Sequence, residues 1–271
     1  MPHFSAHDGT KLAYHLQGTG SPLVCLPGGP ARPSRYLGDL GGIPRRLILA
    51  DGRGTGESDA AADPETYRWD RLADDVEALR EHLGLDRVDL LAHSAGANVA
   101  IRYAGLHPER VSSLALITPS TVAAGFVPTP EDQEAGLARR AHEPWYEQAR
   151  ASYLAEEGTE FLPLFYGRWD DEIAAHALLD FETSEQPPAL GFYAPSPVTP
   201  EEVRAGIARL DAPVLVLAGE VDAHPCRDHA RSLAGLFPDA RLVMQRGVAH
   251  FPWVDEPADF ARIVTEFLDA R

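Results

Sequence analysis

Lysine is almost missing from this chain of 271 residues, with Lys11 as the single example. Lys11 lies in a stretch of alternating polar and apolar residues that is typical of a strand. Schiff-base chemistry would have to use this one residue, and the phosphate-binding loop that needs Gly-Lys-Ser/Thr does not occur in the sequence. We therefore exclude pyridoxal phosphate enzymes and nucleotide-binding enzymes of the P-loop type.

Positive charge and cysteine are also scarce. The chain has 24 lysine and arginine residues against 41 acidic ones, a net charge of −17. We expect neither nucleic acid nor an anionic membrane as a partner. We interpret the negative net charge as a feature that keeps the protein soluble. The alternative is that it attracts a cationic substrate. The two cysteines, Cys25 and Cys226, are too few for a disulfide scaffold, so we expect a reduced, cytoplasmic setting.

Long apolar runs and metal-ligand spacings are lacking as well. No apolar run is long enough to span a bilayer. Residues 1–8 contain neither a basic patch nor an apolar stretch, so we predict no signal peptide. Histidine and acidic residues do not occur at the spacings of metal ligands. We expect no metal and no organic cofactor.

Short unbroken apolar runs are the clearest pattern in what the chain does contain. They cover residues 23–26, 47–50, 88–91, 114–118, 214–217 and 242–244. Such runs are typical of strands buried on both faces of a parallel sheet. Stretches with helical spacing lie between them, at residues 69–83, 97–106, 226–237 and 257–268. This alternation predicts an α/β fold with right-handed crossovers.

Residues 119–209 break the alternation. Strand-like runs are missing there, prolines interrupt the helical stretches, and half of the aromatic residues fall in this part of the chain. We predict that these residues form a helical cap, or lid, over the edge of the sheet at which the parallel strands end. The core then consists of residues 1–118 and 210–271.

Ser94 lies between an apolar run and a helical stretch, in the sequence Ala92-His93-Ser94-Ala95-Gly96. A serine on a sharp turn from strand to helix is the context of a nucleophile elbow, in which small flanking residues let strand and helix approach closely. The usual pattern is G-x-S-x-G, and Ala92 replaces its first glycine. A serine that only caps a helix would also fit these five residues.

Two later segments supply a carboxylate and an imidazole at strand ends. Asp222 follows a buried strand, and His250 lies on the loop after the last strand. Serine needs a base within hydrogen-bond reach and a group that orients this base. The chain order Ser94, Asp222, His250 is that of the α/β-hydrolase triad. His93 and His224 are alternative bases, and a helix N-cap is the alternative role for Asp222.

With these motifs in order, the chain resembles the α/β-hydrolase fold over nearly its whole length. The segments A-G-E-x-D, ending at Asp222, and G-x-x-H-x-x-W-x-D-E-P, containing His250, resemble the acid and base loops of that fold. The resemblance implies a mostly parallel eight-stranded sheet flanked by helices, with the cap after strand 6. It also implies that Ser94 attacks a carbonyl carbon, that His250 carries the proton and that Asp222 orients the imidazole.

The loop of residues 27–30, P-G-G-P, resembles the H-G-G-P loop of the proline iminopeptidases, a branch of this fold. Pro27 stands where that branch has histidine, and Ala31 where it has a further glycine. An oxyanion hole needs N–H donors aimed at the developing negative charge. We predict that the backbone N–H groups of Gly29 and Ala95 fill this role, since backbone donors do not depend on the changed side chains.

Residues 51–58, D-G-R-G-T-G-E-S, resemble a second loop of that branch. They are not a dinucleotide fingerprint, because Glu57 or Asp59 occupies the third glycine position of G-x-G-x-x-G. We interpret the segment as a turn that braces the oxyanion loop, with substrate contact by Arg53 as the alternative. Other branches fit less well: dehalogenases and epoxide hydrolases use an aspartate nucleophile, and cofactor-free haloperoxidases usually have methionine at the position of Ala95.

We therefore predict a serine hydrolase for a small or medium acyl substrate, most simply a carboxylic ester, and leave open whether it is a monomer or a homodimer. Candidate substrate contacts are Gly28, Pro30, Trp145, Phe165, Tyr166 and Trp169. One alternative is an aminopeptidase similar to the proline iminopeptidases. It would need carboxylates of the cap to bind the substrate ammonium, for which the candidates are Glu143, Glu147, Glu156, Glu157 and Glu160. A non-hydrolytic ligand-binding or lyase-like member of the fold is the alternative from another class.

Overall fold

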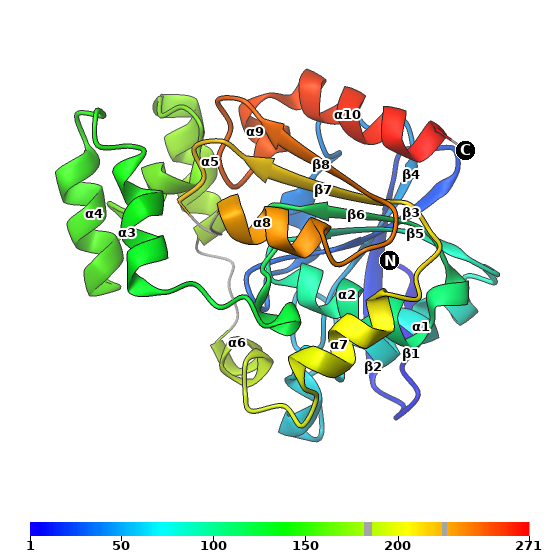
Figure 1. Ribbon diagram of the computed structural model, residues 1–271. Coiled ribbons are helices and arrows are strands. Elements are labelled where there is room, and N and C mark those ends of the chain that lie inside the picture. The colour runs from blue at the N-terminus through cyan, green and yellow to red at the C-terminus, as the bar shows by residue number, and fades with distance from the viewer. Residues whose placement is uncertain (182–185, 224–226, 271) are drawn as a thin grey trace.

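A single twisted sheet organises the computed structural model, which describes residues 1–181, 186–223 and 227–270. Its strands follow the order β1-β2-β4-β3-β5-β6-β7-β8 (Figure 1). The strands are β1 (His3–Ser5), β2 (Lys11–Gln17), β3 (Pro22–Leu26), β4 (Arg46–Ala50), β5 (Val88–His93), β6 (Val111–Ile117), β7 (Val214–Gly219) and β8 (Ala240–Gln245). The pairs β1·β2 and β2·β4 are antiparallel and the other pairs are parallel. The predicted, mostly parallel eight-stranded sheet is confirmed.

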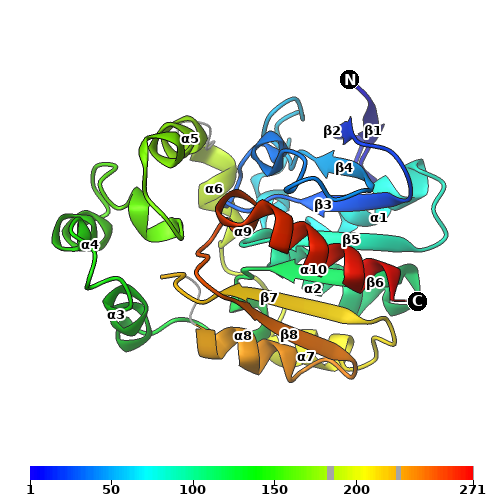
Figure 2. The same cartoon turned by 90° about the horizontal axis from the view of Figure 1, so that it is seen from above.

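Helices cover both faces of this sheet, as the unbroken apolar runs of its parallel strands require. One face packs against α1 (Ala73–His82), α2 (Gly96–Leu106), α7 (Pro200–Ile207) and α8 (Arg227–Ala234). The other face packs against α9 (Pro252–Asp255) and α10 (Pro257–Asp269), as Figure 2 shows from above. Strand β7 is buried along its whole length, because it lies between both layers.

Between β6 and β7 the described residues form helices and no strand. They are η4 (Val122–Ala124), α3 (Pro130–Ala138), α4 (Tyr146–Ala155), η5 (Leu162–Phe165), α5 (Asp171–Phe181), α6 (Gln186–Phe192) and α7. Helices α3, α4 and α5 lie beyond the end of the sheet towards which β7 points (Figures 1 and 2). In contrast, α7 packs on α2, where a Cβ built on Gly206 would lie 2.9 Å from the Cα of Gly105. The domain boundary at residue 209 stays a prediction.

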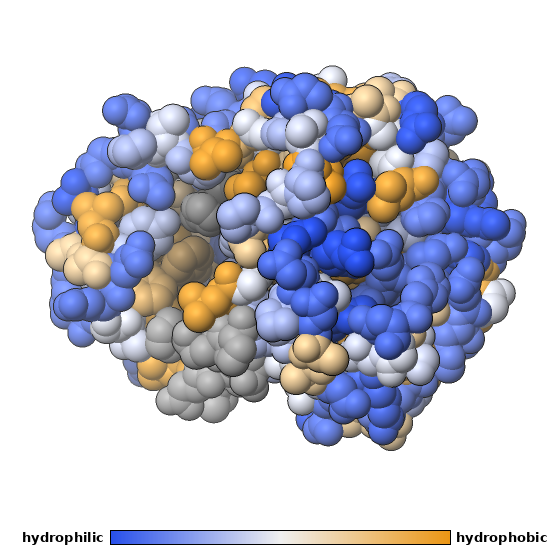
Figure 3. Space-filling model, turned by 90° about the horizontal axis from the view of Figure 1, so that it is seen from below, coloured by the Kyte–Doolittle hydropathy of each residue, from blue (hydrophilic) through white to orange (hydrophobic). Residues whose placement is uncertain are grey.

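The surface drawn in Figure 3 is mostly hydrophilic, in keeping with the excess of acidic residues. Large apolar side chains that are exposed, such as Leu16, Val127 and Leu190, come from separate elements. Within the described ranges, no helix is both long enough and apolar enough to cross a membrane.

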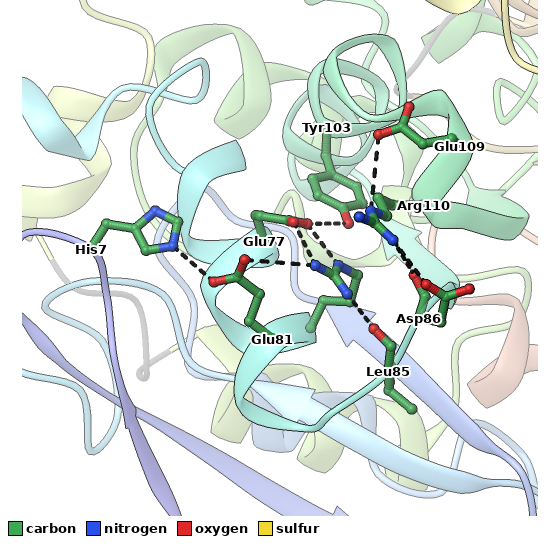
Figure 4. Close-up of polar contacts among 9 residues, drawn as sticks. His7, Glu77, Glu81, Leu85, Asp86, Tyr103, Glu109 and Arg110 are labelled. Carbon is green, nitrogen blue, oxygen red and sulfur yellow. Dashed lines mark hydrogen bonds and ion pairs between the residues drawn. The ribbon is translucent and has the colours of Figure 1, made fainter.

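A polar cluster fastens α1 to α2, the helix that begins next to Ser94. Tyr103 on α2 donates a 2.8 Å hydrogen bond to Glu77 on α1, and Arg80 binds both Glu77 and the carbonyl of Leu85 (Figure 4). The Arg80 guanidinium lowers the pKa of Glu77 to about 2, so this carboxylate stays charged at neutral pH. The cluster therefore fixes the helix that positions the Ser94 turn.

Candidate active site

Ser94 stands on the sharp turn from β5 to α2. Its φ is +49°, in the left-handed region that side chains other than glycine rarely adopt and that costs of the order of 1–3 kcal/mol. The Ser94 N–H donates to the carbonyl of Ile117 at 3.0 Å, and the Ser94 carbonyl accepts from the N–H groups of Ala97 and Ser120. Neighbouring strands and loops thus hold the strained turn, as expected for a nucleophile elbow.

Gly28 and Gly96 allow the loop that begins at Pro27 and the start of α2 to pack closely at the Ser94 turn. A Cβ on Gly96 would lie 2.4 Å from the carbonyl oxygen of Pro27, and a Cβ on Gly28 would lie 2.8 Å from the Cβ of Ser94. Only hydrogen fits at either position, because real Cβ atoms do not approach so closely. The oxyanion loop, defined here as residues 27–31, is therefore packed directly against the Ser94 turn.

Ser94, His250 and Asp222 form one hydrogen-bonded row. His250 Nε2 lies 2.9 Å from Ser94 Oγ, and His250 Nδ1 lies 2.9 Å from Asp222 Oδ2. A carboxylate can only accept, so Nδ1 carries the proton and Nε2 is left to accept from the Ser94 hydroxyl. Asp222 is 1% exposed and His250 is 6% exposed, whereas Ser94 is half-buried. The serine end of the row is thus the accessible one.

The loop that carries His250, residues 247–251, is held from several sides. The His250 N–H donates to the carbonyl of Phe165 at 3.0 Å, and the Phe165 ring lies edge-on to the imidazole with ring centres 5.6 Å apart. The His250 carbonyl accepts from Thr118 Oγ1 and from His93 Nε2, each at 3.0 Å. These contacts fix the backbone and the ring of His250, and they come from three residues that sequence patterns alone did not single out as supports.

The loop that carries Asp222, defined here as residues 219–223, contacts the cap helix α3. Arg139 donates a 3.0 Å hydrogen bond to the carbonyl of Asp222. A Cβ built on Gly136 would lie 2.5 Å from the carbonyl oxygen of Ala223, so the helix and the loop touch through their backbones. Helix α3, part of the predicted cap, therefore supports the loop that carries Asp222. His224 and Cys226 lie outside the described residues.

A second buried carboxylate, that of Asp255 on α9, contacts the His250 loop. Its Oδ2 accepts from the N–H of Ala249 at 2.8 Å, and its carboxylate also accepts from the N–H of Gly167. Burial raises the pKa of Asp255 to about 6. The sequence analysis contained this residue only as a letter of the base-loop motif. The structure shows that it joins the His250 loop to the segment that follows η5.

The two predicted oxyanion donors lie on either side of the Ser94 turn. Gly29 is exposed and Ala95 is buried at the start of α2, where the helix dipole favours negative charge. The N–H of Gly28 donates to the Tyr36 hydroxyl at 2.6 Å. In the described part of the chain, neither the Gly29 N–H nor the Ala95 N–H has a protein acceptor.

The four predicted aromatic contacts of the cap separate into different places. Phe165 touches His250, as described above. Tyr166 is buried, with its ring stacked on Phe251 at 5.0 Å between centres. Trp145 lies under the Arg140 guanidinium, 4.9 Å from its ring centre, and lines a hollow in the cap together with Trp169. Pro30 is half-buried in the oxyanion loop.

Residues 51–58 form hydrogen bonds to Ser34, which follows the oxyanion loop in the sequence. The Asp51 carboxylate accepts from the N–H and the hydroxyl of Ser34, at 2.8 and 2.7 Å. Arg53 forms two hydrogen bonds to Asp75, at 2.7 and 2.6 Å, and a further ion pair with Asp8. The Arg53 guanidinium is thus occupied by carboxylates. The described residues contain no group of three or more side chains that could hold a metal ion.

The chain belongs to the alpha/beta hydrolase fold family, whose pattern it matches over residues 21–257. A proline iminopeptidase from Lactobacillus helveticus (strain DPC 4571) is 25% identical over 293 residues, covering 96% of this chain and 95% of that protein. The 2-hydroxy-6-oxononadienedioate/2-hydroxy-6-oxononatrienedioate hydrolase 2 from Pseudomonas putida is 29% identical over 272 residues, covering 95% and 91%.

A solved esterase from Rhodococcus sp. ECU1013 superposes with a TM-score of 0.78 at 24% identity, covering 99% of this chain and 98% of that one. This likeness concerns the fold. The predicted resemblance is confirmed, and the protein is a hydrolase of this family. The names of these proteins are those of an iminopeptidase, a hydrolase of an oxo-dienedioate and an esterase, so the bond that this chain cleaves has to be argued from its site.

Proposed function

We propose that the protein is a serine hydrolase that cleaves a small or medium carboxylic ester through an acyl-enzyme intermediate. The observation that carries the proposal is the row of Ser94, His250 and Asp222, with both contacts at 2.9 Å and the serine on a strained turn. This geometry gives a weak nucleophile the base and the orienting carboxylate that it needs.

Acylation begins when Ser94 Oγ attacks the ester carbonyl carbon and its proton passes to His250 Nε2. The proton then passes from the imidazolium to the alkoxide leaving group, the carbon–oxygen bond of the ester breaks, and the acyl group stays on Ser94. Water repeats the sequence: its proton goes to His250, its oxygen attacks the acyl carbon, and the proton returns to Ser94 as the acid leaves. Asp222 stabilises the imidazolium in each half.

Gly29 and Ala95 supply the N–H groups for the oxyanion. Both face no protein acceptor among the described residues, and they flank the turn that carries the nucleophile. Each such donor contributes about 2.7–4 kcal/mol of transition-state stabilisation. The start of α2 at Ala95 adds the favourable end of a helix dipole.

An apolar cavity of about 80 Å³ beside the oxyanion loop supports an apolar acyl or alcohol group in the substrate. Gly28 and Gly96 line this cavity, and Gly28 also packs against Ser94, which is itself not part of the lining. Its apolar lining comes mainly from core strands, α1, α2 and the helix α6, and includes Leu26, Val76, Val99 and Phe192. Charged side chains also line it, among them Asp51, Arg53 and Asp75.

Release of an N-terminal residue is the second candidate, since the relatives include proline iminopeptidases. We place it below ester cleavage because of the cap carboxylates. Glu143 lies 3.3 Å from Arg140, which neutralises it. The other four candidates are exposed rather than gathered at the triad: Glu147, Glu156, Glu157 and Glu160. A non-hydrolytic member of the fold is disfavoured because no residue of the row is replaced.

Labelling with a fluorophosphonate, followed by hydrolysis of p-nitrophenyl butyrate, tests the proposal. We expect labelling of the native protein and none of Ser94→Ala, with a loss of kcat of about 10⁶-fold. Ser152→Ala is the matched control, because Ser152 lies on α4 and its hydroxyl donates to the carbonyl of Glu157. Cleavage of a prolyl arylamide without cleavage of esters would favour the peptidase, and a folded protein that stays unlabelled would contradict both.

A further inference from the structure

A series of hydrogen bonds links the oxyanion loop to the His250 loop. The Gly28 N–H lies 2.6 Å from the Tyr36 hydroxyl, which lies 2.7 Å from His93 Nδ1. At the other side of the ring, His93 Nε2 lies 3.0 Å from the carbonyl oxygen of His250. Tyr36 belongs to the short helix η1 (Ser34–Leu37), and His93 directly precedes the nucleophile.

The chemistry of the groups fixes the direction of each bond. A carbonyl oxygen only accepts, so His93 Nε2 carries the proton and donates to His250. His93 Nδ1 then accepts, and the Tyr36 hydroxyl must donate to it. This leaves an oxygen lone pair of Tyr36 for the Gly28 N–H. The protons in this series of hydrogen bonds therefore have one consistent arrangement, with a donor and an acceptor at every contact.

His93 is neutral in this arrangement. Burial and the neighbouring His250 ring hold the pKa of His93 well below its usual value, and the two ring centres are 4.8 Å apart. Arg32, 4.9 Å from the centre of the Tyr36 ring, adds to the same effect. A neutral ring suits this place, because a second cation would oppose the imidazolium that forms on His250 during catalysis.

We propose that Tyr36 and His93 are positioning residues that set the oxyanion loop and the catalytic imidazole at fixed places relative to Ser94. The inference rests on the proposed function. By taking the Gly28 N–H, Tyr36 holds the loop so that the next amide, Gly29, is the one left for the substrate. By donating to the His250 carbonyl, His93 holds the backbone of the base. Neither residue needs to touch the substrate.

Ring packing alone is the competing explanation, since the Tyr36 ring lies 6.2 Å from both Phe251 and Trp253. Tyr36→Phe separates the two, because it keeps the ring and removes only the hydroxyl. Tyr14→Phe is the matched control: Tyr14 is buried, its hydroxyl lies 3.3 Å from His82 Nε2, and neither residue belongs to the site.

The experiment measures kcat and KM for p-nitrophenyl butyrate, with active sites counted by the fluorophosphonate so that only folded enzyme is compared. For Tyr36→Phe we expect kcat per site to fall about 10- to 100-fold, as for a misplacement of catalytic groups by a fraction of an ångström to one ångström. We expect KM to stay within about threefold, and Tyr14→Phe to keep both constants. In the double variant Tyr36→Phe/His93→Gln, the fall in kcat should be smaller than the product of the two single falls, because both substitutions interrupt the same series of hydrogen bonds.

A Tyr36→Phe enzyme with kcat per site within twofold of the native value would overturn the inference, and so would an equal fall in Tyr14→Phe. If Tyr36→Phe does not fold, His93→Gln alone is judged by the same limits, since it keeps a donor for His250 but breaks the link to Tyr36. Native protein without ester hydrolysis or labelling would instead contradict the proposed function, so the two failures are distinguishable.

Discussion

Gly28 shows how little space single residues have around Ser94. Gly28→Ala would place a Cβ 2.8 Å from the Cβ of Ser94 and 2.9 Å from His93 Nδ1. We expect a loss of stability of about 1–3 kcal/mol from overpacking, together with a fall in kcat of about tenfold or more as the oxyanion loop moves. Urea unfolding and ester kinetics measure both. Gly52→Ala is the control, because its Cβ would meet only Thr55 Oγ1 at 3.8 Å; equal effects in the two variants would contradict the prediction.

Asp255 makes stability depend on pH. Its pKa is raised from 3.8 to about 6 by burial, so the folded protein holds a proton that the unfolded chain loses between these values. This carboxyl therefore lowers the free energy of unfolding as pH rises from about 4 to 6, by about 1–3 kcal/mol. Asp255→Asn should remove that part of the pH dependence, as urea unfolding at several pH values would show. Asp259→Asn, half-exposed on α10, should leave the dependence intact; an unchanged profile in Asp255→Asn would refute the assignment.

The residues of the row could be predicted from sequence because each one follows a recognisable strand or belongs to a loop of the family. Their supports could not. Tyr36 on η1 and His93 at the end of β5 meet only because the fold brings these two elements together, and no spacing in the sequence indicates a contact between positions 57 residues apart. Phe165 was predicted as a substrate contact. Its carbonyl instead accepts from the His250 N–H, and this bond depends on the tertiary packing of η5 against the His250 loop, which sequence patterns do not indicate.

At the scale of elements, strands were easier to predict than helices. Unbroken apolar runs marked the parallel strands, because burial on both faces leaves little other choice of residue. The helix expected at residues 69–83 is α1, which covers only Ala73–His82, since the turns before it satisfy the periodicity without being helical. The short edge strand β1 and the four-residue helix α9 have no such signal. The cap could be predicted as helical, but not the places of its aromatic rings.

Helix α3 offers a test of the contact between cap and acid loop. Alanine normally stabilises a helix relative to glycine by about 1 kcal/mol. Gly136→Ala should do the reverse, because its Cβ would lie 2.5 Å from the carbonyl of Ala223. We expect lower stability and a fall in kcat of about tenfold, measured by thermal unfolding and ester kinetics. Gly235→Ala, with ordinary neighbours at 3.5 Å, is the control; a stabilised, fully active Gly136→Ala would disprove the contact.

At the scale of the whole molecule, the net charge of −17 should select among substrates. The hydrophilic face in Figure 3 belongs to a strongly acidic protein, and its field repels anions over about 10 Å at 0.1 M salt. We expect kcat/KM for an ester with a carboxylate in its acyl chain to rise severalfold between 10 mM and 300 mM salt. A neutral ester of equal length should change little. Equal salt responses would contradict electrostatic exclusion.

The backbone contact between Gly136 and Ala223 also bears on protein engineering. Lids are attractive modules for grafting, since they carry much of an enzyme's selectivity. Here the helical segment between β6 and β7, the predicted lid, is not self-contained: transplanted alone, it would lack residues 219–223, against which α3 packs. Chimaeras built from this scaffold should therefore exchange α3 and residues 219–223 as one unit.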